Sequence, residues 1–232
     1  MSERSASGTG AGVAKPGCPR LYVVLDRTAA GGRDLDELLA AVLAGGAEMI
    51  QLREKTWPSG TLLPLAERLR ARCRAAGVPF IVNDRVDLAV AVDADGVHLG
   101  QEDLPPAAAL ALLPRGKILG LSTHSEAQAA EAQAAGADYV AVGSMFPTAT
   151  KPEFKLVGPA LARRVRPLVR VPLIGIGGIT PDNAGEVVAA GCDGVAVISA
   201  VCAAPDPEAA ARRFVAAVDA ARGSLKREER RL

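Results

Sequence analysis

The segment Leu173-Ile174-Gly175-Ile176-Gly177-Gly178 decides the fold, because a short apolar run leads directly into a pair of glycines. Such a run, ended by a turn, is typical of a buried strand in a parallel sheet. Similar runs recur along the chain, and Ala-rich segments with helical character separate them. The predicted strands are Leu21–Leu25, Met49–Leu52, Phe80–Val82, Gly96–Leu99, Ile118–Leu121, Tyr139–Val142, Leu173–Ile176 and Gly194–Ile198.

Eight strands that alternate with helices predict a parallel sheet with right-handed crossovers. The sheet could be open and doubly wound or closed into a barrel. No Gly-x-Gly-x-x-Gly follows the first strand, and 232 residues accommodate eight strand–helix units, so closure is favoured. The predicted fold is therefore α/β, a single (β/α)8 TIM barrel with a parallel eight-stranded core. Functional residues of such barrels lie at the C-terminal ends of the strands.

The barrel is expected to occupy residues 19–224. Residues 1–18 are rich in Ser, Gly and Ala and lack the apolar core of a signal peptide, so a disordered extension is expected there. Residues 225–232 are expected to form a charged, solvated tail. No run of about 18 uncharged apolar residues occurs. A cytoplasmic protein without membrane contact is therefore expected.

The overall composition excludes several classes of function. A net charge of +1 leaves no basic surplus for nucleic acid or a membrane surface, so any anion site must be local. The 4 cysteines lack metal-ligand spacing and only 2 histidines are present. We therefore expect neither a zinc site nor a disulfide framework. The sequence is compatible with a homo-oligomer but does not define one.

Two cations and an amide follow the second predicted strand, in Gln51-Leu52-Arg53-Glu54-Lys55. Alternation along a strand directs Gln51, Arg53 and Lys55 to one side and the other two residues away from them. This arrangement can bind an anion. Ion pairing of the cations with Glu54 at the surface explains the same pattern equally well.

Asp84 and Asp103 follow the third and fourth strands, which are neighbours in a barrel. Two carboxylates on adjacent loops, with amides and hydroxyls nearby, suit Mg²⁺ held together with substrate phosphate. Either aspartate alone is better explained as a helix cap: Asp103 before Leu104-Pro105-Pro106 and Asp84 before Val86–Ala91. Their pairing on neighbouring loops favours the metal site.

Ser122 is the residue expected to point into the site after the fifth strand. Ser125 is expected to cap the next helix, with Gln128 completing a capping box. His124 is a candidate acid or base, although a histidine at a helix start is more often structural.

Three further loops offer phosphate-binding groups. The long segment after the sixth strand, 143–152, carries several hydroxyls and a lysine near its end. Hydroxyl groups and an ammonium group can together bind a phosphate. Gly177-Gly178 and Ile198-Ser199 follow the seventh and eighth strands, where this fold recurrently binds phosphate through backbone N–H groups. A packing role for the glycines is the alternative. Two anionic substrates, one of them a diphosphate, are the simplest interpretation. The sequence offers no Cys or Ser nucleophile paired with a base, which argues against covalent catalysis.

An ordered set of motifs resembles the thiamine phosphate synthase family over roughly Arg20 to Ala221. The motifs are QLREK (51–55), NDRVDLA (83–89), DGVHLGQEDLP (95–105), GLSTHS (120–125), VGSMFPTATK (142–151), IGIGGI (174–179) and DGVAVIS (193–199). The resemblance implies transfer of a hydroxymethylpyrimidine group from its diphosphate to the nitrogen of thiazole phosphate. The products would be thiamine phosphate and pyrophosphate. The partners would be these small molecules, and the cofactor Mg²⁺.

The same resemblance implies residue roles. The pyrimidine diphosphate would be held by Gln51, Leu52, Arg53, Glu54, Lys55 and Asn83. Asp84 and Asp103 would bind Mg²⁺. The departing diphosphate would contact Ser122 and Lys151, which with Arg53 and Lys55 form the implied catalytic set. The thiazole phosphate would meet Thr148, Ala149 and Thr150, and its phosphate would meet Gly178, Ile198 and Ser199.

Two alternatives use the same barrel. A thiazole tautomerase would keep the phosphate-binding loops and could use His124 for proton transfer, but it would not require the aspartate pair or the Thr-x-Thr-Lys pattern at 148–151. A non-catalytic barrel that binds a phosphorylated ligand would not require charged groups at every strand end. For the synthase, an electron-rich pyrimidine favours dissociative substitution without a covalent enzyme intermediate.

Overall fold

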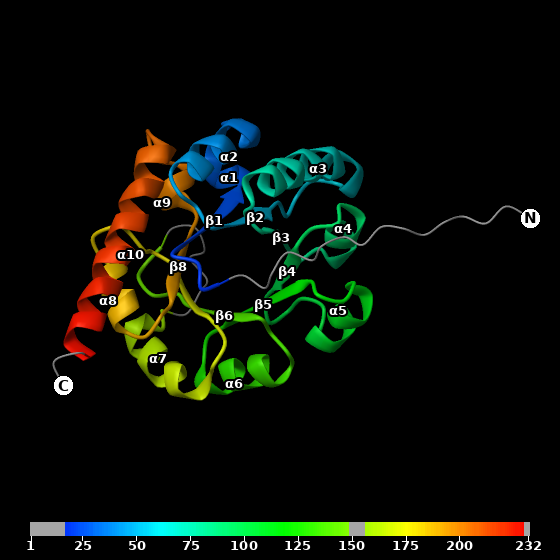
Figure 1. Cartoon of the computed structure of the whole chain (residues 1–232). Helices are drawn as coiled ribbons and strands as arrows, with labels where there is room; N and C mark the ends of the chain where they lie inside the picture. Colours follow the sequence, from blue (N-terminus) through cyan, green and yellow to red (C-terminus); the bar gives the residue numbers. More distant parts are fainter. Residues whose placement is uncertain (1–16, 149–155, 230–232) are drawn as a thin grey trace, which may run out of the picture.

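Eight parallel strands form a closed barrel in the computed structural model, which describes residues 17–148 and 156–229. Each strand pairs with its neighbours in the sequence, and β8 closes onto β1 (Figure 1). The (β/α)8 fold predicted from the sequence is confirmed. The strands are β1 (Leu21–Asp26), β2 (Met49–Arg53), β3 (Phe80–Asn83), β4 (Gly96–Leu99), β5 (Ile118–Thr123), β6 (Tyr139–Val142), β7 (Leu173–Ile176) and β8 (Gly194–Val197).

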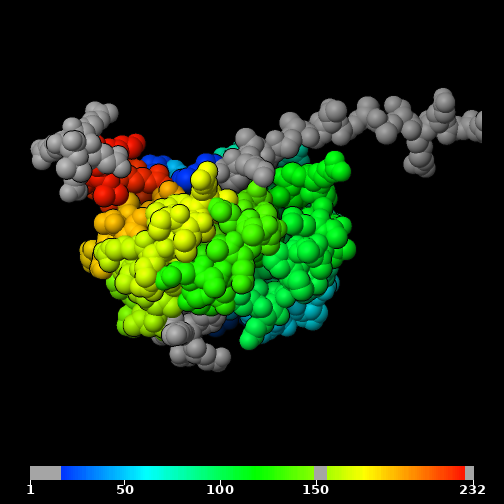
Figure 2. Space-filling model, turned by 90° about the horizontal axis from the view of Figure 1, so that it is seen from below, coloured from blue at the N-terminus to red at the C-terminus, as the bar shows by residue number. Residues whose placement is uncertain are grey.

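Helices surround the barrel in chain order, and the side view shows the same succession of segments (Figures 1 and 2). Within the described residues they are α1 (Arg27–Ala30), α2 (Leu35–Ala44), α3 (Ser59–Ala76), α4 (Val86–Ala91), α5 (Pro106–Leu112), α6 (Glu126–Ala134), α7 (Gly158–Val165), the 3-10 turn η1 (Arg166–Leu168), α8 (Ala184–Ala189), α9 (Ser199–Cys202) and α10 (Pro207–Glu229). No helix in this part of the chain has the length and apolar character needed to cross a bilayer.

Alternate residues of each strand divide into two buried sets. Leu21, Val23 and Leu25 of β1 belong to the large cluster between strands and helices, whereas Tyr22 belongs to the smaller cluster inside the barrel. Burying one such aliphatic side chain contributes about 1.5–3 kcal/mol. The interior cluster consists of Tyr22, Met49, Ile81, Ile118, Tyr139, Ile174 and Ala196, with Ile176 packed against it. This layer closes the barrel beneath the strand ends.

An acidic residue directly precedes each of β2, β4, β6 and β8. Its carboxylate accepts a hydrogen bond from a backbone N–H at or next to the start of the strand before it. Asp95 Oδ2, for example, lies 2.8 Å from the Phe80 nitrogen. These bonds fix the stagger of neighbouring strands at the end of the barrel opposite the strand C-termini. The pairs are Glu48 with Arg20, Asp95 with Phe80, Asp138 with Leu119 and Asp193 with Leu173.

Asp95→Ala is expected to lower the free energy of unfolding by about 1–3 kcal/mol, because the partly buried Phe80 N–H loses its acceptor. The activity that the sequence resemblance implies should stay unchanged well below the melting temperature, since the bond lies away from the strand C-termini. Urea unfolding measures the change, with the exposed Glu67→Ala on α3 as the control. Equal effects of the two substitutions would show that the acidic residues do not hold the strands.

The strands β1, β2, β3 and β5 run one or two residues further than predicted, and the structure also corrects the C-terminal tail and the end of the eighth strand. The segment 225–232, predicted to be a solvated tail, begins as the last turns of α10, which reaches Glu229. The reason is that the apolar stripe of this helix continues through Ala221 and Leu225, which pack against the core, while basic Lys226 and Arg227 favour the C-terminal end of the helix dipole. Ile198, predicted to end the eighth strand, lies beyond β8 as the N-cap of α9. The predicted extension 1–18 falls outside the described residues up to position 16.

Candidate active site

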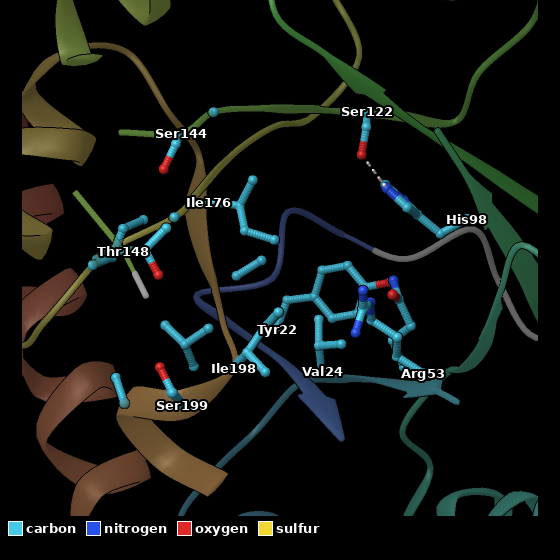
Figure 3. Close-up of a pocket in the computed structure, with 18 of the residues that line it drawn as sticks. Tyr22, Val24, Arg53, His98, Ser122, Ser144, Thr148, Ile176, Ile198 and Ser199 are labelled. Atoms are coloured by element: carbon cyan, nitrogen blue, oxygen red, sulfur yellow. Dashed lines mark hydrogen bonds between the residues drawn. The ribbon is translucent and has the colours of Figure 1, made fainter. Parts of the chain in front are cut away.

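One pocket opens at the C-terminal ends of the strands and receives side chains from most of the barrel (Figure 3). Its lining includes many of the residues predicted from the sequence. These are Gln51, Arg53, Asn83, Ser122, Thr148, Gly178, Ile198 and Ser199. The structure therefore brings together residues from β2, β3 and β5 with those of the loops after β6, β7 and β8. Ala149, Thr150 and Lys151 lie outside the described residues.

Arg53 is held in place by a residue that the sequence did not reveal. Asp26 pairs with Arg53 across the β1–β2 register, is 4 % exposed, and also accepts the Ala29 N–H at the start of α1. Among the described residues, two buried side-chain nitrogens lack a hydrogen-bond partner: Arg53 Nε and Asn83 Nδ2. Buried donors of this kind are normally satisfied. Both residues line the pocket, so a ligand rich in hydrogen-bond acceptors would satisfy these donors once the two side chains turn toward it.

Asp26→Asn is expected to raise KM for the diphosphate substrate that the sequence resemblance implies by about tenfold, because the Arg53 guanidinium loses the charge that orients it. Asparagine keeps the oxygen that caps α1, so folding should be preserved. Steady-state kinetics with each substrate varied in turn measures the effect. A change confined to the thiazole substrate would contradict this assignment of Arg53.

Leu52 and Glu54 do not line the pocket. Leu52 is buried among the helix-facing residues, and the Glu54 carboxylate accepts hydrogen bonds from Thr56, the Trp57 N–H and Arg27 Nε, the last at 2.7 Å. Burial raises the pKa of Glu54, but the hydrogen bonds outweigh it and lower the pKa to about 2. The partner of Glu54 is thus Arg27, which rules out the alternative in which it pairs with Arg53 or Lys55.

Lys55, Asp84 and Asp103 form a charged group beside the pocket. Lys55 Nζ lies 3.1 Å from Asp84 Oδ2, and Asp103 Oδ2 accepts the Gly100 N–H at 2.6 Å. Burial, and then the adjacent Asp84 carboxyl, raise the pKa of Asp103 despite the opposing Gly100 N–H and Lys55. The two carboxyls are therefore close neighbours, as the sequence predicted.

The helix-cap alternatives for the two aspartates are not realised. Helix α4 begins after Arg85 and helix α5 after Pro105, and neither has a side-chain cap. Asp84 instead adopts a left-handed backbone with φ of 61°. Two adjacent carboxylates, hard oxygen donors, suit Mg²⁺ bound together with substrate phosphate and water. The donor chemistry thus fits a divalent cation.

Ser122 faces the pocket and Ser125 caps α6, both as predicted. Ser125 Oγ accepts the Gln128 N–H at 3.2 Å, and Gln128 Oε1 accepts the His124 N–H at 2.7 Å. His124 Nδ1 lies 2.6 Å from the Gly143 carbonyl oxygen. Since a carbonyl only accepts, this nitrogen carries a proton and His124 ties the loop after β6 to β5. Ser122 Oγ lies 2.8 Å from Nε2 of His98, a pocket residue not predicted from the sequence.

The glycines after β7 lie against the loop that follows β6. Gly178 has φ of +64°, and a Cβ there would come within 2.6 Å of the Phe146 oxygen and 2.5 Å of the Pro147 oxygen. Gly177 approaches Ser144 in the same way. Both glycines also line the pocket, together with Ser199 and Ala200 at the start of α9, which follows the neighbouring strand β8. The turn after β7 therefore packs tightly and also exposes its backbone to the pocket. The first N–H groups of α9 have no partners within the helix, so they are available to bind an anion.

Comparisons with known proteins identify the family. The sequence model described as "Thiamine monophosphate synthase" matches residues 21–201. A thiamine-phosphate synthase of Moorella thermoacetica is 51 % identical over 204 residues, covering 88 % of this chain and 97 % of the relative. One from Methanospirillum hungatei is 48 % identical, covering 84 % and 95 %. The solved structure of thiamine phosphate pyrophosphorylase from Pyrococcus furiosus is 40 % identical, with a TM-score of 0.81 and coverage of 87 % and 96 %. The chain belongs to the thiamine monophosphate synthase family.

Proposed function

We propose that this chain, a thiamine-phosphate synthase and hence a transferase, divides its two anionic substrates between opposite sides of one pocket. The pyrimidine diphosphate lies against β2, β3 and the aspartate pair, and the thiazole phosphate lies against the loops after β7 and β8. The observation that carries this division is the pair of unsatisfied donors, Arg53 Nε and Asn83 Nδ2, on the side opposite the glycine turn.

The reaction breaks one bond and forms another. The C–O bond between the pyrimidine methylene and the diphosphate breaks, and its electron pair leaves with pyrophosphate. The lone pair of the thiazole nitrogen then forms the new C–N bond, which makes the nitrogen positive, and no proton is transferred. Arg53, Lys55 and Ser122 stabilise the charge that accumulates on the leaving diphosphate. The phosphate grip at Gly178 and Ser199 positions the thiazole nitrogen for attack.

Asp84 and Asp103 are the residues that would hold Mg²⁺. When bound, the ion would neutralise charge on the diphosphate oxygens. Lys55, which pairs with Asp84, can turn toward the same oxygens because its side chain is about half exposed, at 51 %. Ala149, Thr150 and Lys151 are proposed to approach the substrates from the loop after β6, in line with the family motif.

The direct test incubates the purified protein with both substrates and Mg²⁺ and separates the products. Thiamine phosphate and pyrophosphate should appear in equal amounts, and EDTA should stop their formation. Isomerisation of the thiazole substrate alone would identify a tautomerase, and binding without turnover would identify a non-catalytic barrel. Either result would overturn the proposal. Trapping of a pyrimidine adduct on the protein would contradict the dissociative route.

A further inference from the structure

Five polar side chains form a continuous hydrogen-bonded chain across the floor of the pocket. It begins with Gln51 Nε2, which donates to the Tyr22 hydroxyl. Tyr22 and Tyr139 hydroxyl oxygens lie 2.8 Å apart, and Tyr139 lies 2.8 Å from His98 Nδ1. His98 Nε2 then reaches Ser122 Oγ at 2.8 Å; Figure 3 shows this last link. The chain thus joins β1, β2, β4, β5 and β6.

The two tyrosines of the chain are buried, and one glycine makes room for one of them. Tyr22 and Tyr139 are each 1 % exposed, and their rings meet edge to face with centroids 5.8 Å apart. A Cβ on Gly120 would lie 2.1 Å from the Tyr139 ring, so only glycine lets this ring cross to His98. An apolar core would fill the same space without buried polar groups that each require a partner. The tyrosine hydroxyls therefore have a use beyond packing.

In this structure the Gln51 amide turns its nitrogen toward Tyr22. An amide nitrogen can only donate, so this orientation, which the NMR experiment below tests, gives each hydrogen bond of the chain one direction. The Tyr22 oxygen accepts this hydrogen bond, so Tyr22 donates the proton of its own hydroxyl in a hydrogen bond to the Tyr139 oxygen. Tyr139 in turn donates to His98 Nδ1. Desolvation raises the pKa of both tyrosines, and they remain protonated donors at neutral pH. With Nδ1 accepting, a neutral His98 carries its proton on Nε2 and donates it to Ser122.

We infer that Tyr139 and His98 are positioning residues that make Ser122 a hydrogen-bond donor toward the departing diphosphate. Because Ser122 Oγ accepts from His98, its own proton points to another acceptor, and Ser122 lines the pocket. A serine hydroxyl without this constraint could equally present its lone pairs, which would repel an anion. The inference deepens the proposed function and rests on it for the identity of the anion.

Nitrogen-15 NMR of histidine-labelled protein reads the His98 tautomer directly, and the 2 histidines of the chain make assignment simple. The wild type should show Nε2 protonated and Nδ1 bare. In Tyr139→Phe, Nδ1 loses its donor and the Nδ1–H form should gain population. A wild-type His98 with its proton on Nδ1 would overturn the inference. This readout needs no turnover, so it stands apart from a failure of the proposed function.

A double-mutant cycle then tests whether Tyr139 acts through Ser122. Tyr139→Phe should lower kcat about tenfold, because Ser122 loses one hydrogen bond to the charged leaving group. KM for thiazole phosphate should stay unchanged. In a Ser122→Ala background the same substitution should have no further effect. Losses that multiply would show a merely structural role. Tyr22→Phe, which keeps the ring, interrupts the chain one link earlier and should shift the tautomer the same way, so the test survives poor folding of the first variant.

Discussion

Asp103→Asn is expected to lower kcat by about 10²–10³-fold while the protein stays folded. Asparagine retains an oxygen for the Gly100 N–H, which Asp103 accepts at 2.6 Å, so the loop after β4 keeps its shape. The substitution removes only the charge that, with Asp84, would hold Mg²⁺. Asp84→Asn is expected to act in the same direction. The measurement is kcat as a function of Mg²⁺ concentration, together with calorimetric titration of the free protein with Mg²⁺ and pyrophosphate.

Asp87→Asn is the matched control for this experiment. Asp87 lies in the first turn of α4, close in sequence to Asp84, and pairs with Arg85 at the surface. The Arg85 hydrogen bonds lower the pKa of Asp87, and its carboxylate pairs with Arg85, whereas Asp84 pairs with Lys55 beside Asp103. The Asp87 variant should keep both rate and Mg²⁺ dependence. Survival of rate and Mg²⁺ dependence in the Asp84 and Asp103 variants would show that the metal assignment is wrong.

Gly178→Ala is expected to raise KM for thiazole phosphate by about 10²-fold or more, with a much smaller effect on the pyrimidine substrate. The added methyl group would press on the backbone oxygens of Phe146 and Pro147, at 2.6 and 2.5 Å, and these oxygens cannot turn aside. The turn after β7 must then shift, and its N–H groups move away from the phosphate. Initial-rate kinetics with each substrate varied in turn gives the two KM values.

Gly31→Ala separates backbone strain from displacement of the turn. Gly31 has nearly the same φ, +62° against +64°, but a Cβ there meets nothing within 4 Å. Both variants should be destabilised by the left-handed backbone. Only Gly178→Ala should impair thiazole phosphate binding. Similar KM values in the two variants would place the phosphate elsewhere.

The fold was predictable because apolar strand segments and Ala-rich helical segments alternate regularly along the sequence. The Ser125 cap and the outward turn of Glu54 followed from local rules. The nearness of Asp84 to Asp103 followed from the pairing of consecutive strands in the predicted barrel. The end of α10 was not predicted, since a charged run has the same sequence in a solvated tail and in a helix whose other side packs against the core.

Asp26, His98 and Tyr139 escaped sequence reasoning because their partners are distant along the chain. His98 meets Tyr139 across 41 positions, and Asp26 meets Arg53 only because β1 and β2 pair in that register. One signal was present: His98 and Tyr139 stand at the strand positions that face the barrel interior, as Gln51 does. A polar residue at an interior position requires a partner, and that requirement could have identified the chain of hydrogen bonds.

A crystal structure with Mg²⁺, pyrophosphate and thiazole phosphate bound tests the division of the pocket most directly. We expect pyrophosphate within hydrogen-bond distance of Arg53 Nε and Asn83 Nδ2, Mg²⁺ between Asp84 and Asp103, and the thiazole phosphate at the Gly178 and Ser199 backbone. Both anions bound on the same side, or a metal ion away from the two aspartates, would contradict the account.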